Sequence, residues 1–119
     1  MSVLAAVLVA AVAAVHVYIL VLEMFFWRTS RGRKAFGTTA EFAESTATMA
    51  ANQGLYNGFL AAGLLWSFVA GHATFQFRAF FLLCVLIAGL YGALTGVRTA
   101  LFAQSVPAAL ALAAVVIAG

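Results

Sequence analysis

An apolar stretch from Val3 to Trp27 constrains this chain more than any other feature of its sequence. At about 1.5 Å per residue, a helix over this stretch is long enough to cross the roughly 30 Å hydrocarbon core of a bilayer. No basic region precedes it, and it exceeds the roughly 7–15 apolar residues of a secretory signal. We therefore interpret it as a retained membrane helix.

The composition of the whole chain points the same way. Of 119 residues, 66% are hydrophobic and 8% are charged, and the mean hydropathy is +1.13. A soluble globule of this size buries only about 65% of the surface that its unfolded chain exposes, which is too little to hide so much apolar surface. We therefore expect one integral membrane domain over residues 1–119, with the lipid bilayer as its solvent.

Apolar segments and breakers predict an all-α membrane protein, a four-transmembrane-helix antiparallel bundle. Thr38 and Glu41 fit a capping box at the start of the second helix, and Pro107 would start or kink the fourth. Gly32 and Gly37 are expected to act as breakers in an Arg-rich loop. The helices are expected at about 3–27, 39–70, 78–99 and 101–118, and the loop at 28–38.

Four of the six basic residues lie in that loop, namely Arg28, Arg31, Arg33 and Lys34. A basic cluster beside an apolar helix is typical of a cytoplasmic loop near anionic lipid headgroups. The positive-inside rule then places both termini outside a cell (inner) membrane. We expect these side chains to contact headgroups or to form a lid, and we expect no nucleic-acid partner.

Glu23 is an acid inside an apolar helix, where a carboxylate is costly unless it is paired or protonated. His16 lies on the same helix face but about 10 Å away, too far for both to hold one metal ion. A proton relay through water and structural pairing with another helix are both open. At the same expected depth, Arg98 is the partner that we predict for an ion pair with Glu23.

Most polar residues of the expected helices belong to their cytoplasmic halves. Their convergence predicts a site for a small ligand, although a structural hydrogen-bond network would give the same pattern. Small residues also recur every four positions, as in Gly54 and Gly58 or Ala88 and Gly92, which favours close helix packing. The candidate ligand-binding residues are Glu23, Asn52, Gln53, Tyr56, Asn57, Tyr91 and Arg98.

No sequence motif indicates a particular reaction. The chain has no HExxH, no CxxC and no phosphate-binding glycine loop, so we assign no metal site and no catalytic residue. Whether the protein is an enzyme stays open.

Three runs of residues carry a family resemblance: HVYILVLEMFFW at 16–27, RGRKAFG at 31–37 and NQGLYNGFLA at 52–61. With them, nearly the whole chain resembles a family of small bacterial and fungal membrane proteins known only as a domain of unknown function. The resemblance implies four transmembrane helices and no established activity.

A second resemblance is to the MAPEG enzymes, membrane-associated proteins of eicosanoid and glutathione metabolism. It lies in the long first helix, the Arg-rich loop, and Asn52 followed by Tyr56. It implies a MAPEG-like topology and a homotrimer with a glutathione or lipid site between subunits on the cytoplasmic side. In that superfamily an Arg and a Glu flank the Asn where this chain has Thr48 and Leu55, so the usual glutathione contacts are missing.

Three functions follow as alternatives. The first is a membrane protein that binds or moves a small amphiphile or ion through the polar site. The second is a MAPEG-like membrane enzyme acting on a lipophilic substrate. The third is a structural membrane subunit whose polar residues only hold helices together.

Overall fold

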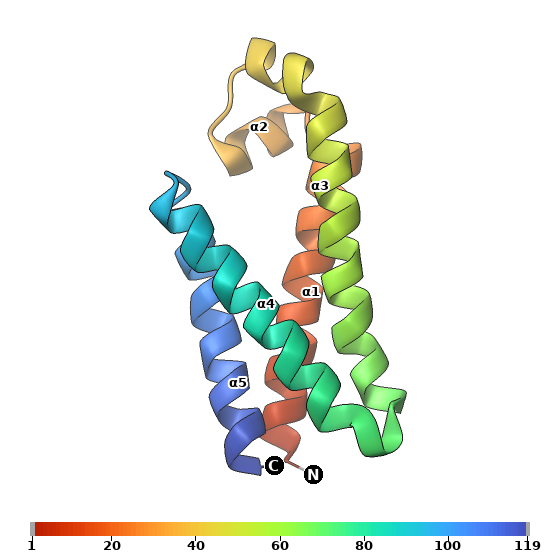
Figure 1. The fold of residues 1–119 in the computed structure, drawn as a ribbon. Helices are drawn as coiled ribbons and strands as arrows, with labels where there is room; N and C mark the ends of the chain where they lie inside the picture. The colour runs from red at the N-terminus through yellow and green to blue at the C-terminus, as the bar shows by residue number, and fades with distance from the viewer. Residues whose placement is uncertain (1, 119) are drawn as a thin grey trace. The chain divides into compact units, whose positions relative to one another are not determined.

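The computed structural model describes residues 2–118, and within them it contains helices and turns but no strand (Figure 1). The chain divides into two compact units, Met1–Val15 with Leu60–Gly119 (unit 1) and His16–Phe59 (unit 2). The α-helices are α1 (Val3–Phe25), α2 (Ser30–Phe36), α3 (Ala40–Trp66), α4 (Thr74–Leu94) and α5 (Val106–Ala118). The shorter elements are the 3-10 helices η1 (Ser67–Val69) and η2 (Gly71–Ala73), and the π-helix η3 (Leu101–Ser105).

Three helical segments of the described chain are long and apolar enough to cross a membrane: Val3–Phe25, Gly71–Leu94 and Leu101–Ala118. Less than a third of each is buried inside the chain, so most of their apolar surface faces outward. Such helices are suited to a hydrocarbon solvent and indicate a membrane protein. The predicted fourth span, α3, is not among them, because the amides of Asn52, Gln53 and Asn57 make it less apolar.

Unit 1 packs the first half of α1, the end of α3, α4 and α5 around one apolar core. Figure 1 shows α4 and α5 as an antiparallel pair, with the first turn of α1, the η1–η2 turn and the last turn of α5 at one end of the unit. All four segments contribute buried side chains to the core: Ala5, Val9, Val12, Ala13, Leu64, Leu82, Val85, Ala108, Ala111 and Val115.

Gly89 allows α4 to approach η3 closely. A methyl group on Gly89 would lie 2.7 Å from the Ser105 backbone nitrogen and 2.9 Å from the Ala100 carbonyl oxygen. At the same place the Ser105 hydroxyl donates a hydrogen bond to the Leu86 carbonyl at 3.0 Å. Without the hydrophobic effect to distinguish a helix from lipid, such close backbone contacts hold membrane helices together.

The segment that we predicted as a loop contains a short helix, α2. Thr29 caps it by accepting a hydrogen bond from the Gly32 backbone N–H at 3.2 Å. Gly32 is therefore a buried helical residue, and the prediction of a breaker there was wrong. Gly37 does end the helix, with φ of 68°, a conformation that glycine adopts at no steric cost.

The start of α3 also differs from the prediction by one residue. The Thr39 hydroxyl, not that of Thr38, accepts the capping hydrogen bond, from the Phe42 backbone N–H at 3.1 Å. Glu41 is consequently one position too early for a capping box. It still lies in the first turn of α3, where a negative charge is favourable to the helix dipole.

Helix α4 is shifted toward the N-terminus of its predicted range, whereas the predicted helix at 101–118 coincides with the apolar span Leu101–Ala118, which consists of η3 and α5. Helix α4 begins at Thr74 and ends at Leu94, so Arg78 lies in its second turn and Arg98 lies in the turn that follows it. The predicted helix at 78–99 therefore extended too far, because it included Arg98. Pro107 is the second residue of α5, directly after the π-helix η3, and as a proline it has no N–H to donate to that preceding turn.

We predict that Gly89→Ala lowers the free energy of unfolding by about 1–3 kcal/mol, because the added methyl group meets backbone atoms that cannot rotate away. Gly92→Ala is the control, since its added methyl group would meet only the Ala100 Cβ, at 3.0 Å. Unfolding in detergent micelles, followed by circular dichroism, measures both. A Gly89→Ala variant as stable as the Gly92→Ala variant would contradict the proposed close contact.

Candidate functional site

Unit 2 pairs the second half of α1 with α3 in an antiparallel arrangement. A methyl group on Gly54 would lie 2.5 Å from Met24 Cγ and 3.1 Å from Glu23 Cβ, and one on Gly58 would lie 2.7 Å from Leu20 Cδ1. These two glycines confirm that the small-residue stripe of α3 is a packing surface. Because they have no side chain, they bring the α3 backbone close to Glu23.

Glu23 and Asn57 form the polar contact between these two helices. The Asn57 Nδ2 group donates to Glu23 Oε1 at 2.7 Å and to the Gln53 carbonyl oxygen at 3.1 Å. Both side chains are half-buried. Within the described residues, Glu23 Oε2 has no hydrogen-bond partner. One carboxylate oxygen is therefore held by the protein while the other is available to a ligand.

Glu23 lines a groove of about 480 Å³ in unit 2. Small-molecule sites are typically about 300–1,000 Å³, mostly apolar, with a few polar groups that orient the ligand. This groove fits that description, because methionine, phenylalanine, tryptophan and alanine side chains accompany one carboxylate, one guanidinium and two threonines. The groove is lined by Glu23, Met24, Phe25, Trp27, Arg28, Thr29, Ala47, Thr48 and Ala51.

Trp27 makes two contacts that hold the end of the groove nearest α2. The Trp27 Nε1 group donates to the Thr46 hydroxyl at 3.1 Å, and the Trp27 ring lies 4.9 Å from that of Phe36 in α2. Arg28 and Glu44 form an exposed ion pair at 3.4 Å, and such pairs contribute little to stability. The tryptophan therefore fixes this end of the groove, and Glu44 is the counter-charge of Arg28.

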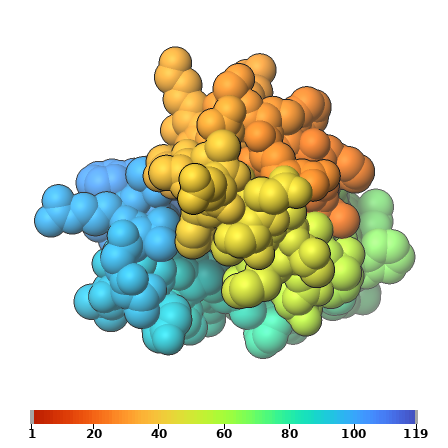
Figure 2. Space-filling view, turned by 90° about the horizontal axis from the view of Figure 1, so that it is seen from above, coloured from red at the N-terminus to blue at the C-terminus, as the bar shows by residue number. Residues whose placement is uncertain are grey.

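The basic side chains of α2 lie at the surface of unit 2. Arg31 and Lys34 are exposed and Arg33 is half-buried. In Figure 2 the orange and yellow atoms of α2 and the start of α3 form the surface seen from above. Their predicted contact with lipid headgroups, or their function as a lid, stays a prediction.

The structure brings together only part of the predicted ligand site. Glu23 and Asn57 meet, whereas Asn52, Gln53 and Tyr56 are exposed on α3. Tyr91 and Arg98 are exposed residues of unit 1, whose position relative to unit 2 is not determined. The hydrogen-bond partner that the structure gives Glu23 is Asn57, and the ion pair with Arg98 stays a prediction.

His16 is fully buried and takes part in an interaction within the chain, and its predicted proton relay with Glu23 is untested. In the described part of the chain, no three His, Cys, Asp or Glu side chains are grouped to hold a metal ion.

Sequence reasoning did not find Thr46 and Thr48 near the groove. Helical threonines carry no clear signal, because they commonly hydrogen-bond their own backbone, as Thr46 does to the Phe42 carbonyl at 2.6 Å.

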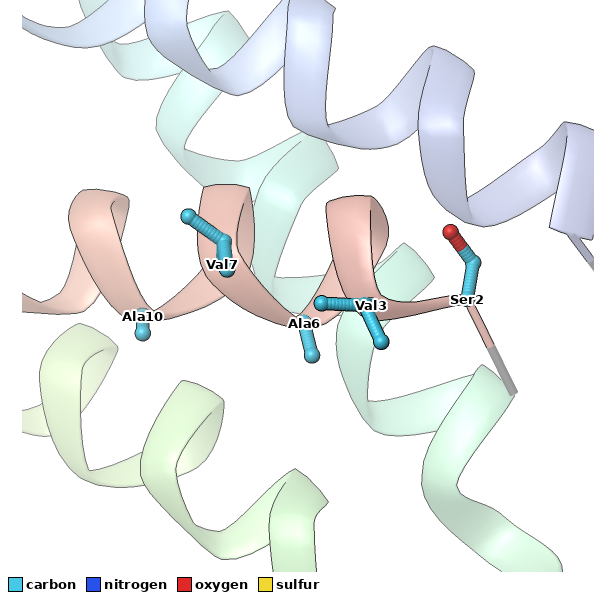
Figure 3. A pocket seen from close by; sticks show the side chains of 5 residues that line it. All are labelled: Ser2, Val3, Ala6, Val7 and Ala10. Atoms are coloured by element: carbon cyan, nitrogen blue, oxygen red, sulfur yellow. The ribbon is translucent and has the colours of Figure 1, made fainter.

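A second hollow, of about 270 Å³, lies beside the first turns of α1 in unit 1. Figure 3 shows its five lining side chains, Ser2, Val3, Ala6, Val7 and Ala10. The Ser2 hydroxyl already accepts the Ala5 backbone N–H at 3.1 Å. This hollow presents no charged group, so it offers hydrocarbon contact without chemical selectivity.

The fold and the groove together define a helical membrane protein that carries an acidic side chain at a small-molecule-sized groove. The family model described as "Protein of unknown function (DUF1304)" matches residues 4–116, and the chain belongs to this family. It is similar to the uncharacterized protein YpaA of Lactococcus lactis subsp. lactis (strain IL1403). The two are 31% identical over 114 residues, which cover 94% of this chain and 96% of that protein. No solved structure matches the chain.

These comparisons confirm the predicted resemblance to a family of unknown function. They give no support to the predicted resemblance to the MAPEG enzymes.

We predict that the Glu23–Asn57 hydrogen bond contributes about 1 kcal/mol of coupling energy to folding. The measurement is a double-mutant cycle of Glu23→Leu and Asn57→Leu, unfolded in micelles. Gln53→Leu is the matched control, because this neighbouring amide side chain is exposed and makes no hydrogen bond within the described residues. Strict additivity of the two substitutions would contradict the predicted coupling.

Proposed function

We propose that this protein is a four-span membrane protein that binds a small amphiphile in the groove of unit 2, with the polar head of the ligand at Glu23. The observation that carries this function is the Glu23 carboxylate. Asn57 holds Oε1 at 2.7 Å, Oε2 has no partner within the described residues, and the side chain lines a groove of about 480 Å³.

The chemistry of the groove selects the class of ligand. An ionised carboxylate oxygen only accepts hydrogen bonds, so the ligand head must donate one, as an ammonium group does. Arg28, the cation of the groove, already contacts Glu44 at 3.4 Å. Met24, Phe25 and Ala47 offer apolar contact to a short tail. A single-chain amine therefore fits better than a fatty acid.

The path of the chain supports α3 as the fourth span. In unit 1, α1 runs away from the end that holds the η1–η2 turn, and the last residues of α3 run back toward it (Figure 1). If α1 crosses the bilayer, α3 must return through it to reach that turn. The 27 residues of α3 extend about 40 Å, which is sufficient. The polar groups of α3 would then face Glu23, a lipid headgroup region or another subunit.

We predict that Ser30 and Thr99 are cytoplasmic and that Ser2 and His72 are on the outer side, as the positive-inside rule requires for four spans. Cys84 is the chain's one cysteine, so a Cys84→Ala background accepts single cysteines at these four positions. Labelling of intact cells with a membrane-impermeant maleimide should modify positions 2 and 72 only. Labelling of positions 30 and 72 from the same side would show that α3 does not cross.

We predict that octylamine binds the groove at least about tenfold more tightly than octanoate or octanol, because only the amine head carries a cation to Glu23. The chain has two tryptophans, so a Trp66→Phe background leaves Trp27 in the groove as the fluorescence reporter. Titrations in nanodiscs of neutral lipid compare three ligands with the same tail. Glu23→Gln should remove the preference for the amine.

Glu41→Gln is the matched control for the titrations, because it removes an exposed acid of unit 2 that does not line the groove. Equal response to all three heads, or an unchanged preference in Glu23→Gln, would contradict amphiphile binding at Glu23. A response to glutathione instead would favour the MAPEG-like enzyme. Unfolding of the Glu23 variant together with no ligand response in the parent protein would favour a structural subunit.

A further inference from the structure

Arg78 is a buried cation in unit 1, far along the chain from the groove residues. Its side chain is 3% exposed, in the second turn of α4. The Nε group donates to the Ser67 hydroxyl at 3.2 Å, and the guanidinium carbon lies 4.7 Å from the centroid of the Phe68 ring. The Nη2 atom is buried and has no acceptor within the described residues.

No acidic side chain of unit 1 is available as a counter-charge for this guanidinium. The chain has three acidic residues, and all of them, Glu23, Glu41 and Glu44, belong to unit 2. A buried cation at membrane depth without an anion is strongly unfavourable, and such residues usually pair or mark a binding site. The missing partner of Arg78 is therefore expected to come from outside the unit.

The contacts around Arg78 fix its orientation and leave Nη2 without an acceptor within the described residues. The Ser67 hydroxyl donates to the Leu64 carbonyl at 2.5 Å, so it accepts from Nε. Thr74 donates to the Ser67 carbonyl at 2.7 Å and ties the turn to α4. A guanidinium held at Nε presents its two terminal nitrogens as a planar fork, the geometry that matches two oxygens of a phosphate or carboxylate.

The position of Arg78 indicates that this anion belongs to a lipid. The span that contains Arg78 begins at Gly71, so the residue lies only about 10 Å along the helix from the end of the span. A long arginine side chain at this depth reaches the headgroup region. The surrounding surface is apolar, with Phe68 at 41%, Val69 at 71% and Phe75 at 45% exposure. Acyl chains suit that surface, whereas a free anion has nothing else to hold it.

We propose that Arg78, positioned by Ser67, binds the phosphate of an anionic phospholipid at the turn between α3 and α4. The Phe68 ring, which lies over the guanidinium and is partly exposed, moves aside when the headgroup enters. The bound phosphate supplies the counter-charge that no acidic side chain of unit 1 provides. This site is separate from the groove of unit 2 and does not depend on the amphiphile bound there.

The test compares melting temperatures in detergent micelles with added dioleoyl phosphatidylglycerol, dioleoyl phosphatidylcholine or inorganic phosphate. The wild-type protein is compared with Arg78→Gln and with Arg98→Gln, the matched control that removes an exposed arginine of the same unit. Phosphatidylglycerol should stabilise the wild type and Arg98→Gln equally, and Arg78→Gln by less than half as much. Inorganic phosphate at the same concentration should have no effect on any of them.

Equal stabilisation of all three proteins by phosphatidylglycerol would overturn the assignment, and a response to inorganic phosphate alone would show a free-anion site instead. If Arg78→Gln does not fold, a second measurement on the folded wild-type protein still tests the proposal. In protein labelled with ¹⁵N-arginine, the Nε–Hε resonance of Arg78, assigned with Arg78→Lys, should shift with phosphatidylglycerol. An unshifted Arg78 resonance at saturating lipid would also overturn the proposal.

Discussion

A polar group at membrane depth has no water to satisfy it, and this constraint shapes both units of the protein. In unit 2, α1 carries a carboxylate and α3 returns an amide to it at 2.7 Å. The contact forms only because Gly54 lets the two helices approach so closely. In unit 1, Ser67 accepts the one hydrogen bond of Arg78 within the described residues, while Ser105 satisfies a carbonyl of α4.

The two units meet this constraint in opposite ways. Unit 1 buries a continuous set of alanine, valine and leucine side chains. Its buried polar side chains, Ser67, Arg78 and Ser105, lie outside that set. Unit 2 has few buried apolar residues and keeps its acid beside a groove. A polar group with hydrogen-bond partners for only some of its polar atoms stabilises the fold less than a fully hydrogen-bonded one. Such a group is a natural place for a ligand to bind. The larger apolar core therefore lies in unit 1, and the groove beside Glu23 lies in unit 2.

Much of the fold was predictable, because the length and hydropathy of α1, α4 and α5 need no knowledge of their neighbours. The errors lie where contacts outweigh local signals. Gly32 was predicted to act as a helix breaker within a loop. It is instead buried within α2, where a methyl group would meet the Phe26 carbonyl. The predicted site mixed Glu23 and Asn57, which do meet, with Tyr56 and Tyr91, which are exposed. The type of a residue and its depth in the membrane cannot distinguish side chains that meet from side chains that are exposed, because neither property gives the direction in which a side chain points.

The sequence by itself determined that this is a helical membrane protein and that Glu23 is costly at membrane depth. Helix length and hydropathy are properties of single segments, and the cost of a buried charge is a property of its chemistry. Only the tertiary structure decided the partners: Asn57 for Glu23, and Ser67 with Phe68 for Arg78. Partner choice depends on how closely and at what rotation two helices pack. In lipid, this distance and rotation are set by short-range contacts between residues far apart in the sequence. A local sequence pattern does not predict such contacts.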